Sequence, residues 1–204
     1  MASTMMHLLA GDGFANADDR VKGTGKFYLG CFLPDSVNVN GFAPKEVRWA
    51  AHLRAKTPRE WYENVGRFYT ENRKRYDSDP LLGYCIHCIT DAAFDEFLHH
   101  GIWENAKKLQ YPQHSGMGPG WDECFRFDRT VMDGPWWKEK IKLMLETTVP
   151  QGIGSVSAEL AARYLKYTLN DYYNTLPPES PTFVTPEIIK ELTVKTLEKT
   201  EVYL

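Results

Sequence analysis

The segment DPLLGYCIHCITDAAFDEFL, residues 79–98, decides the fold. Its apolar side chains recur at intervals of three and four residues, which is the spacing of a helix that faces a core. The helix start is expected near Asp79 and Pro80. Gly83 lies inside the pattern and marks a place where a second helix approaches closely. We therefore predict a helix over residues 79–98 that packs against at least one other helix.

Helix signals continue on both sides of this segment, and alternating strand patterns are scarce. Thr57 and Glu60 form a capping box around Pro58, which predicts a helix from there to about Arg75. Further helices are predicted over residues 135–147, 157–170 and 186–201, and the Pro- and Gly-rich stretch 111–120 is predicted to be a loop. Helix signals are dense only from Lys45 onward. The expected fold is all-α, a compact multi-helix single domain over residues 1–204 with its C-terminal helix, 185–203, at the periphery.

Composition restricts the function classes. The 204 residues are 43% hydrophobic with a formal net charge of -3, so a basic surface for general nucleic-acid binding is not expected. Four cysteines are too few for a disulfide scaffold of this size. Cys85 and Cys88 form a Cys-x-x-Cys pair, read either as a zinc-knuckle or redox motif or, as we favour, as two small packed side chains. We see no transmembrane segment and no signal peptide, and expect a cytoplasmic protein.

Within residues 79–98, the side chains that are suited to binding a metal are His87 and Asp91. They are four residues apart, so a helix places them on one face. Imidazole and carboxylate are ligands that zinc, iron and manganese accept. The same pair is equally typical of a buried histidine that is hydrogen-bonded to an acid on its own helix. A metal site therefore requires ligands from elsewhere in the chain.

Three such residues stand in apolar surroundings. His7 precedes an apolar run near the start of the chain, and His52 lies within the apolar stretch 47–53. Asp35 follows the apolar run 27–33, where burial of a carboxylate without a cation would be costly. Each alone is more typical of a surface residue or a hydrogen-bonded core residue. Together with His87 and Asp91 they form a candidate set of five metal ligands.

The order and spacing of these residues resemble those of the zinc-dependent phospholipase C and P1-nuclease-like proteins, particularly their shorter bacterial members. The resemblance covers about the first half of the chain. It rests on His7, the Leu29–Asp35 segment with its Gly and Pro-Asp, His52, and the Gly-Tyr-x-x-His-x-x-x-Asp segment Gly83–Asp91. It implies an all-α fold, one zinc held by Asp35, His52, His87 and Asp91, and a second zinc held by His7. The resemblance also implies that Asp91 bridges the two ions. We expect Asp35 and Asp91 to be the catalytic carboxylates.

The resemblance also has gaps. The chain begins Met1-Ala2-Ser3 in place of a ligating tryptophan, and the later His ligands have no clear match. His99 and His100 are expected to end a helix instead. We therefore expect one or two ions. As additional ligands or outer-shell supports we single out Asp122, Glu123 and Asp128 after the Gly-rich loop, with Asp95 and Thr90 near Asp91. As pocket walls we single out Trp121 and Trp136.

These residues predict a metal-dependent hydrolase, with zinc as the expected ion and iron or manganese as alternatives. A divalent ion activates water and stabilises charge on a phosphoryl oxygen, so we expect a phosphoester substrate, either a small molecule or a lipid headgroup. One alternative is a helical module that binds metal without catalysis. A second is an HD-type phosphohydrolase, which is disfavoured because no His in this chain is followed by Asp.

Overall fold

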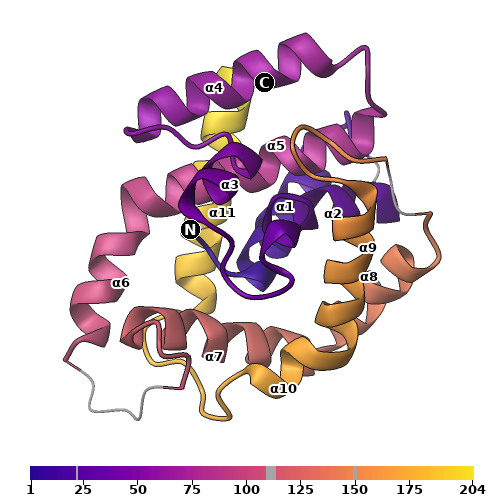
Figure 1. The fold of residues 1–204 in the computed structure, drawn as a ribbon. Coiled ribbons are helices and arrows are strands. Elements are labelled where there is room, and N and C mark those ends of the chain that lie inside the picture. The colour runs from indigo at the N-terminus through magenta and orange to yellow at the C-terminus, as the bar shows by residue number, and fades with distance from the viewer. Residues whose placement is uncertain (22, 109–113, 149–150) are drawn as a thin grey trace.

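The computed structural model describes residues 1–21, 23–108, 114–148 and 151–204 (Figure 1). Within these ranges every secondary-structure element is a helix, which confirms the all-α prediction. In chain order the elements are α1 (Thr4–Ala17), α2 (Gly25–Phe32), the 3-10 helix η1 (Pro34–Asn38), α3 (Lys45–Ala51), α4 (Pro58–Asn72), α5 (Ser78–Ala93), the π-helical turn η2 (Phe94–Leu98), α6 (His99–Ala106), α7 (Pro119–Asp133), α8 (Pro135–Leu145), α9 (Ala158–Tyr167), the π-helical turn η3 (Thr168–Tyr172), α10 (Tyr173–Thr175) and α11 (Pro186–Tyr203).

Helix α5 lies at the centre of the molecule. Every residue from Pro80 to Ala93 is buried, including the polar His87 and Asp91. It packs against α1, α2, α4 and α11, which surround it in Figure 1. In α11, Ile189 and Leu192 are buried. None of the helices in the described ranges is both long and apolar enough to cross a membrane.

The close approach predicted at Gly83 is confirmed. A Cβ atom on Gly83 would lie 2.2 Å from the Phe27 carbonyl oxygen, and one on Gly30 would lie 2.4 Å from the Pro80 carbonyl oxygen. Helices α2 and α5 therefore meet backbone against backbone, with a glycine on each side of the contact. This contact brings the end of α2 next to the middle of α5.

The predicted helix boundaries are confirmed in some places and wrong in others. The capping box is present, since Thr57 accepts a hydrogen bond from the Glu60 amide and Glu60 accepts one from the Thr57 amide. The predicted loop is found at residues 114–118, while its earlier residues lie outside the described ranges and Pro119 already begins α7. The prediction that His99 ends a helix is wrong. The π-helical turn η2 carries the chain straight into α6, so His99 begins that helix.

The first 40 residues are also more regular than their sequence indicates. Helices α1 and α2 form there despite the polar, glycine-rich stretch between residues 11 and 25. Met5, Leu8 and Phe14 of α1 are buried in the core. Tertiary burial of these side chains therefore outweighs a weak local helix preference.

Candidate metal centre

The five predicted ligands lie together in the core of the protein. His7 comes from α1, Asp35 from η1 and His52 from the residue that ends α3, while His87 and Asp91 come from α5. All five are buried, and Asp35, with 8% of its surface exposed, is the most accessible. Their ligand atoms form two groups of three in which the atoms lie within 4.8 Å of one another: His7, His87 and Asp91, and Asp35, His52 and His87.

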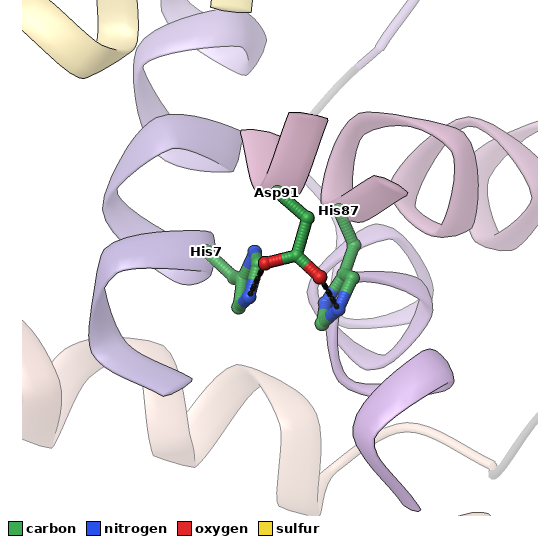
Figure 2. Close-up of side chains that lie close together, drawn as sticks. All are labelled: His7, His87 and Asp91. Atoms are coloured by element: carbon green, nitrogen blue, oxygen red, sulfur yellow. Dashed lines mark ion pairs between the residues drawn. The ribbon is translucent and has the colours of Figure 1, made fainter. Parts of the chain in front are cut away.

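The Asp91 carboxylate is the centre of this cluster. Figure 2 shows it between the rings of His7 and His87, with one oxygen directed toward each. Its Oδ1 lies 3.3 Å from His7 Nε2, and its Oδ2 lies 3.9 Å from His87 Nε2 and 3.7 Å from His52 Nε2. The Ala2 amide donates a 2.7 Å hydrogen bond to Oδ1. On the far side, Asp35 Oδ1 lies 3.2 Å from His52 Nε2.

Backbone carbonyls orient two of the three histidine rings. His87 Nδ1 lies 2.7 Å from the Cys31 carbonyl oxygen, and His52 Nδ1 lies 2.8 Å from the Arg48 carbonyl oxygen. Because a carbonyl oxygen only accepts, each Nδ1 carries a proton. Nε2 of His87 therefore presents a lone pair to the cluster, whereas Nε2 of His52 hydrogen-bonds to the Asp35 carboxylate. Metal-binding histidines are commonly fixed in this way through their second nitrogen.

The α2–α5 contact and the end of α3 set the positions of these carbonyls and rings. Close packing at Gly83 brings the Cys31 carbonyl within reach of His87. Helix α3 ends at His52 because Leu53 takes a left-handed conformation, with φ 53°, and the amides of Leu53 and Arg54 bond back to the helix. The Trp61 indole then donates a 2.7 Å hydrogen bond to the His52 carbonyl. Such strained backbone persists only where its surroundings enforce it.

The local electrostatics keep the cluster in a form that suits a cation. Burial lowers the pKa of His87 to about 3, so its ring is neutral at physiological pH. Burial would raise the pKa of Asp91, but the neighbouring rings of His7 and His52 hold that pKa well below its ordinary value. Burial would likewise lower the pKa of His52, yet its hydrogen bond to Asp35 raises it. Ionised carboxylates and at least one neutral ring therefore face one another.

Several nitrogen and oxygen atoms of the cluster make no hydrogen bond. Among the described residues, both ring nitrogens of His7, Nε2 of His87 and Oδ2 of Asp91 are buried and make no hydrogen bond. Buried polar atoms are normally hydrogen-bonded, because an unpaired one costs about 1–3 kcal/mol. The rings of His7 and His87 also stack with centroids 3.5 Å apart. A divalent cation bound to these nitrogen and oxygen atoms fits this donor set, and zinc is a common ion for it.

Asp122 and Glu123, predicted as additional ligands or outer-shell supports, bind backbone amides outside the cluster. Asp122 accepts hydrogen bonds from the amides of His114 and Ser115, and Glu123 accepts from those of Thr182 and Phe183. Both carboxylates therefore hold loop backbone.

Asp128 accepts hydrogen bonds from the Ser3 hydroxyl at 2.5 Å and from the Tyr172 hydroxyl. Asp95 forms an ion pair with Arg54, and the Thr90 hydroxyl donates to the Ile86 carbonyl. The structure places none of Asp95, Thr90 and Asp128 in the two groups of ligand atoms.

Cys85 and Cys88 are fully buried in an apolar cluster, which agrees with their interpretation as packed side chains. Burial raises the pKa of both thiols. They therefore remain protonated and are poor metal ligands.

A cavity of about 410 Å³ lies beside the cluster, and Asp35 forms part of its wall. Of the two tryptophans predicted to line a pocket, Trp121 does so. Trp136 instead donates a hydrogen bond to Asp12. Phe42, Tyr164 and Tyr172 also line the cavity. Sequence reasoning did not identify them as pocket residues, because they come from elements far apart in the chain and carry no shared motif.

Comparison with protein-family models, with curated proteins and with solved structures finds no match for this chain.

Proposed function

We propose that the protein is a metal-dependent hydrolase that acts on a phosphoester, with the buried His–Asp cluster as its metal centre. One observation carries the proposal. Histidine nitrogens and carboxylate oxygens from four elements converge in the core, and several of them are buried without any hydrogen-bond partner. A cation is the simplest group that would satisfy all of them at once. The burial of Asp35 and Asp91 as charged groups has the same explanation.

The donor set suits one or two ions. His87 has only Nε2 to offer, because its Nδ1 proton is bonded to the Cys31 carbonyl. One cation would therefore be held by His87 and His52 with Asp35 and one Asp91 oxygen. His7 and the other Asp91 oxygen, which are 3.3 Å apart, remain for a second ion. Asp91 would then bridge the two positions, the role that the resemblance to the phospholipase C and P1-nuclease-like proteins implies.

The cavity favours catalysis over a purely structural site. Structural zinc sites are closed, commonly cysteine-rich and four-coordinate, whereas catalytic sites leave a position open to substrate. Here all the ligands are nitrogen or oxygen, and Asp35 borders a cavity whose wall includes the exposed side chain of Phe42. When bound, a divalent cation in such a site would supply an activated water and would stabilise charge on a phosphoryl oxygen.

A metal-binding module without catalysis is the second candidate. It is favoured by the complete burial of His52, His87 and Asp91, each with 0% of its surface exposed. In that case the ion would only hold α1, α3 and α5 together. The two candidates predict the same metal content, so activity must distinguish them.

Metal content and activity are tested together on the full chain, purified without chelator. We expect one or two equivalents of zinc by mass spectrometry, with hydrolysis of bis(4-nitrophenyl) phosphate that chelation abolishes and zinc restores. His87→Ala should lose both metal and activity. His100→Ala, which changes an exposed histidine of α6, should keep both. A metal-loaded protein that is inactive on a panel of phosphoesters would favour the structural module. A protein without metal would refute both candidates.

A further inference from the structure

Six aromatic side chains are among the residues that line the cavity beside the cluster, and the cavity meets the proposed metal centre at Asp35. We propose that it binds the organic part of the phosphoester and that this part is an uncharged aromatic ring system. The inference rests on the proposed function, since it places the phosphoryl group at the metal centre. It goes beyond that function in naming the class of substrate and the residues that select it.

The aromatic lining is continuous from the surface to the interior. Phe42, which is 51% exposed, meets Trp121 edge to face with ring centroids 6.1 Å apart. Trp121 stacks on Phe125 at 5.7 Å, and Phe125 meets Tyr172 at 6.5 Å. Tyr167 follows at 6.0 Å from Tyr172. Rings favour stacked and edge-to-face contacts with other rings, so this wall suits a flat aromatic group.

The size and position of the cavity fit such a group. Its volume of about 410 Å³ lies within the range of small-molecule sites, about 300–1,000 Å³. Ser3 and Thr4, at the start of α1, also line it. The first turn of the helix that carries His7 therefore borders the cavity, as does η1 with Asp35. A ligand in the cavity would have its phosphoryl end next to the cluster and its ring along the aromatic wall.

The charges around the cavity argue against a second anionic group on the substrate. No lysine or arginine from the described ranges is among its lining residues. His114 lies 3.6 Å from Glu179, and the Met1 amine pairs with Asp95 at 3.3 Å. Polyanions such as nucleic acids need clustered Lys and Arg, which the described residues of this wall do not provide.

A quaternary ammonium group is the main alternative occupant, because aromatic walls also bind such cations. It is disfavoured here because the proposed divalent ions lie beside the cavity and would repel a cation. Tyr164 and Tyr172 provide no compensating negative charge. Burial raises the pKa of both phenols well above the ordinary value, so they remain neutral. An uncharged ring avoids this repulsion.

Non-hydrolysable phosphonates test the inference by calorimetry on the zinc-loaded full chain. Phenylphosphonate should bind about tenfold more tightly than methylphosphonate, which corresponds to about 1.4 kcal/mol. 4-Phosphonobenzoate, which adds a carboxylate to the same ring, and trimethylammonioethyl phosphonate should each bind no more tightly than methylphosphonate. Equal binding of the phenyl and methyl compounds, no binding of either, or tighter binding of one of the charged compounds would overturn the inference.

Matched variants assign the preference to the wall. Phe42→Ala should reduce the phenyl-to-methyl affinity ratio severalfold, and because Phe42 is exposed the fold should tolerate the change. Phe97→Ala is the control and should leave the ratio unchanged: Phe97 is 40% exposed, and the amines of Lys195 and Lys199 lie over its ring. Trp121→Leu and Trp136→Leu provide a second pair. The wall variant Trp121→Leu should reduce the ratio severalfold, and the control Trp136→Leu should leave it unchanged. An unchanged ratio in both wall variants would overturn the assignment.

Different experimental results would show that this inference fails and that the proposed function fails. A chain that hydrolyses bis(4-nitrophenyl) phosphate only with metal, yet binds phenyl- and methylphosphonate equally, would keep the function and lose the aromatic site. A chain that holds no metal would lose the function and, with it, the substrate inference.

Discussion

Asp91 is the residue on which the account depends most. Its two oxygens face His7, His52 and His87, and an amide from the start of the chain bonds to one of them. Among the ion pairs of the described residues, Asp91 is the carboxylate that pairs with three histidines. The neighbouring rings keep the pKa of Asp91 low, so its charge is present at any physiological pH. We therefore expect metal binding to be more sensitive to this charge than to the shape of the side chain.

Asp91→Asn tests this expectation because it keeps the shape and removes the charge. We expect zinc affinity to fall by at least about tenfold, with far-UV circular dichroism unchanged. Asp95→Asn is the matched control one turn further along the chain, since Asp95 pairs with Arg54 outside the cluster. It should retain the metal. Equal zinc content in both variants would contradict the role given to Asp91.

The two oriented rings give the metal site a defined pH dependence. His87 is neutral, since burial lowers its pKa to about 3. Burial acts the same way on His52, but the bond to Asp35 outweighs it and raises the pKa of His52, so a cation must displace its proton. Zinc affinity, measured by chelator competition from about pH 8 to about pH 5, should fall as pH drops through that raised pKa. Affinity independent of pH over this range would show that His52 is not a ligand.

At the scale of single residues the sequence predicted which side chains meet but not what holds them. The five predicted ligands stand out because a histidine or carboxylate in an apolar stretch is unusual, and because their order and spacing resemble those of the phospholipase C and P1-nuclease-like proteins. The orientation of the rings was not predicted. Asp95 and Thr90 were the expected supports, whereas the carbonyls of Cys31 and Arg48 hold the rings. Every residue has a carbonyl, so nothing in the sequence marks the ones that matter.

At the scale of helices the contact between α2 and α5 positions the centre. The glycine in the deciding segment predicted a close contact but not its partner, because α2 has only weak helix signals of its own. The sequence also did not predict where α3 ends. Leu53 stands where a glycine would normally mark the left-handed residue after a helix, so no sequence signal places His52 there.

Gly83→Ala tests the α2–α5 contact against a matched change in an open position. The added Cβ would lie 2.2 Å from the Phe27 carbonyl oxygen, so backbone must move, and we expect a loss of about 1–3 kcal/mol in the free energy of unfolding. Gly101→Ala adds the same atom in α6 with nothing within 4 Å. It should be stabilising by about 0.5–1 kcal/mol. Urea denaturation measures both, and similar effects at the two sites would contradict the contact.

At the scale of the whole molecule Asp128 joins three distant parts of the chain. It lies on α7 and bonds to Ser3 and the Met5 amide at the start of α1 and to Tyr172 of η3. It therefore holds in place the helix that carries His7. Burial raises the pKa of Asp128 to about 7, although these hydrogen bonds oppose the shift. The folded state therefore favours the protonated form of Asp128 more strongly than the unfolded chain does.

The raised pKa predicts how stability changes with pH. A carboxyl with a raised folded-state pKa contributes its full stability below its ordinary value, 3.8, and loses it as pH rises toward about 7. For metal-free protein this loss amounts to at most about 4 kcal/mol in the free energy of unfolding. Asp128→Asn should lack this decline, so its stability relative to the unmodified chain should improve from about pH 4 to about pH 7. If the free energy of unfolding of Asp128→Asn and that of the unmodified chain differed by the same amount throughout this pH range, the prediction would be contradicted.

The central claim, that the His–Asp cluster holds a metal, is tested most directly by anomalous diffraction from crystals of the zinc-loaded protein at the zinc absorption edge. We expect a peak bound by His52 Nε2, His87 Nε2, Asp35 and Asp91, with any second peak beside His7. A zinc-soaked crystal with no anomalous peak among these five residues would contradict it.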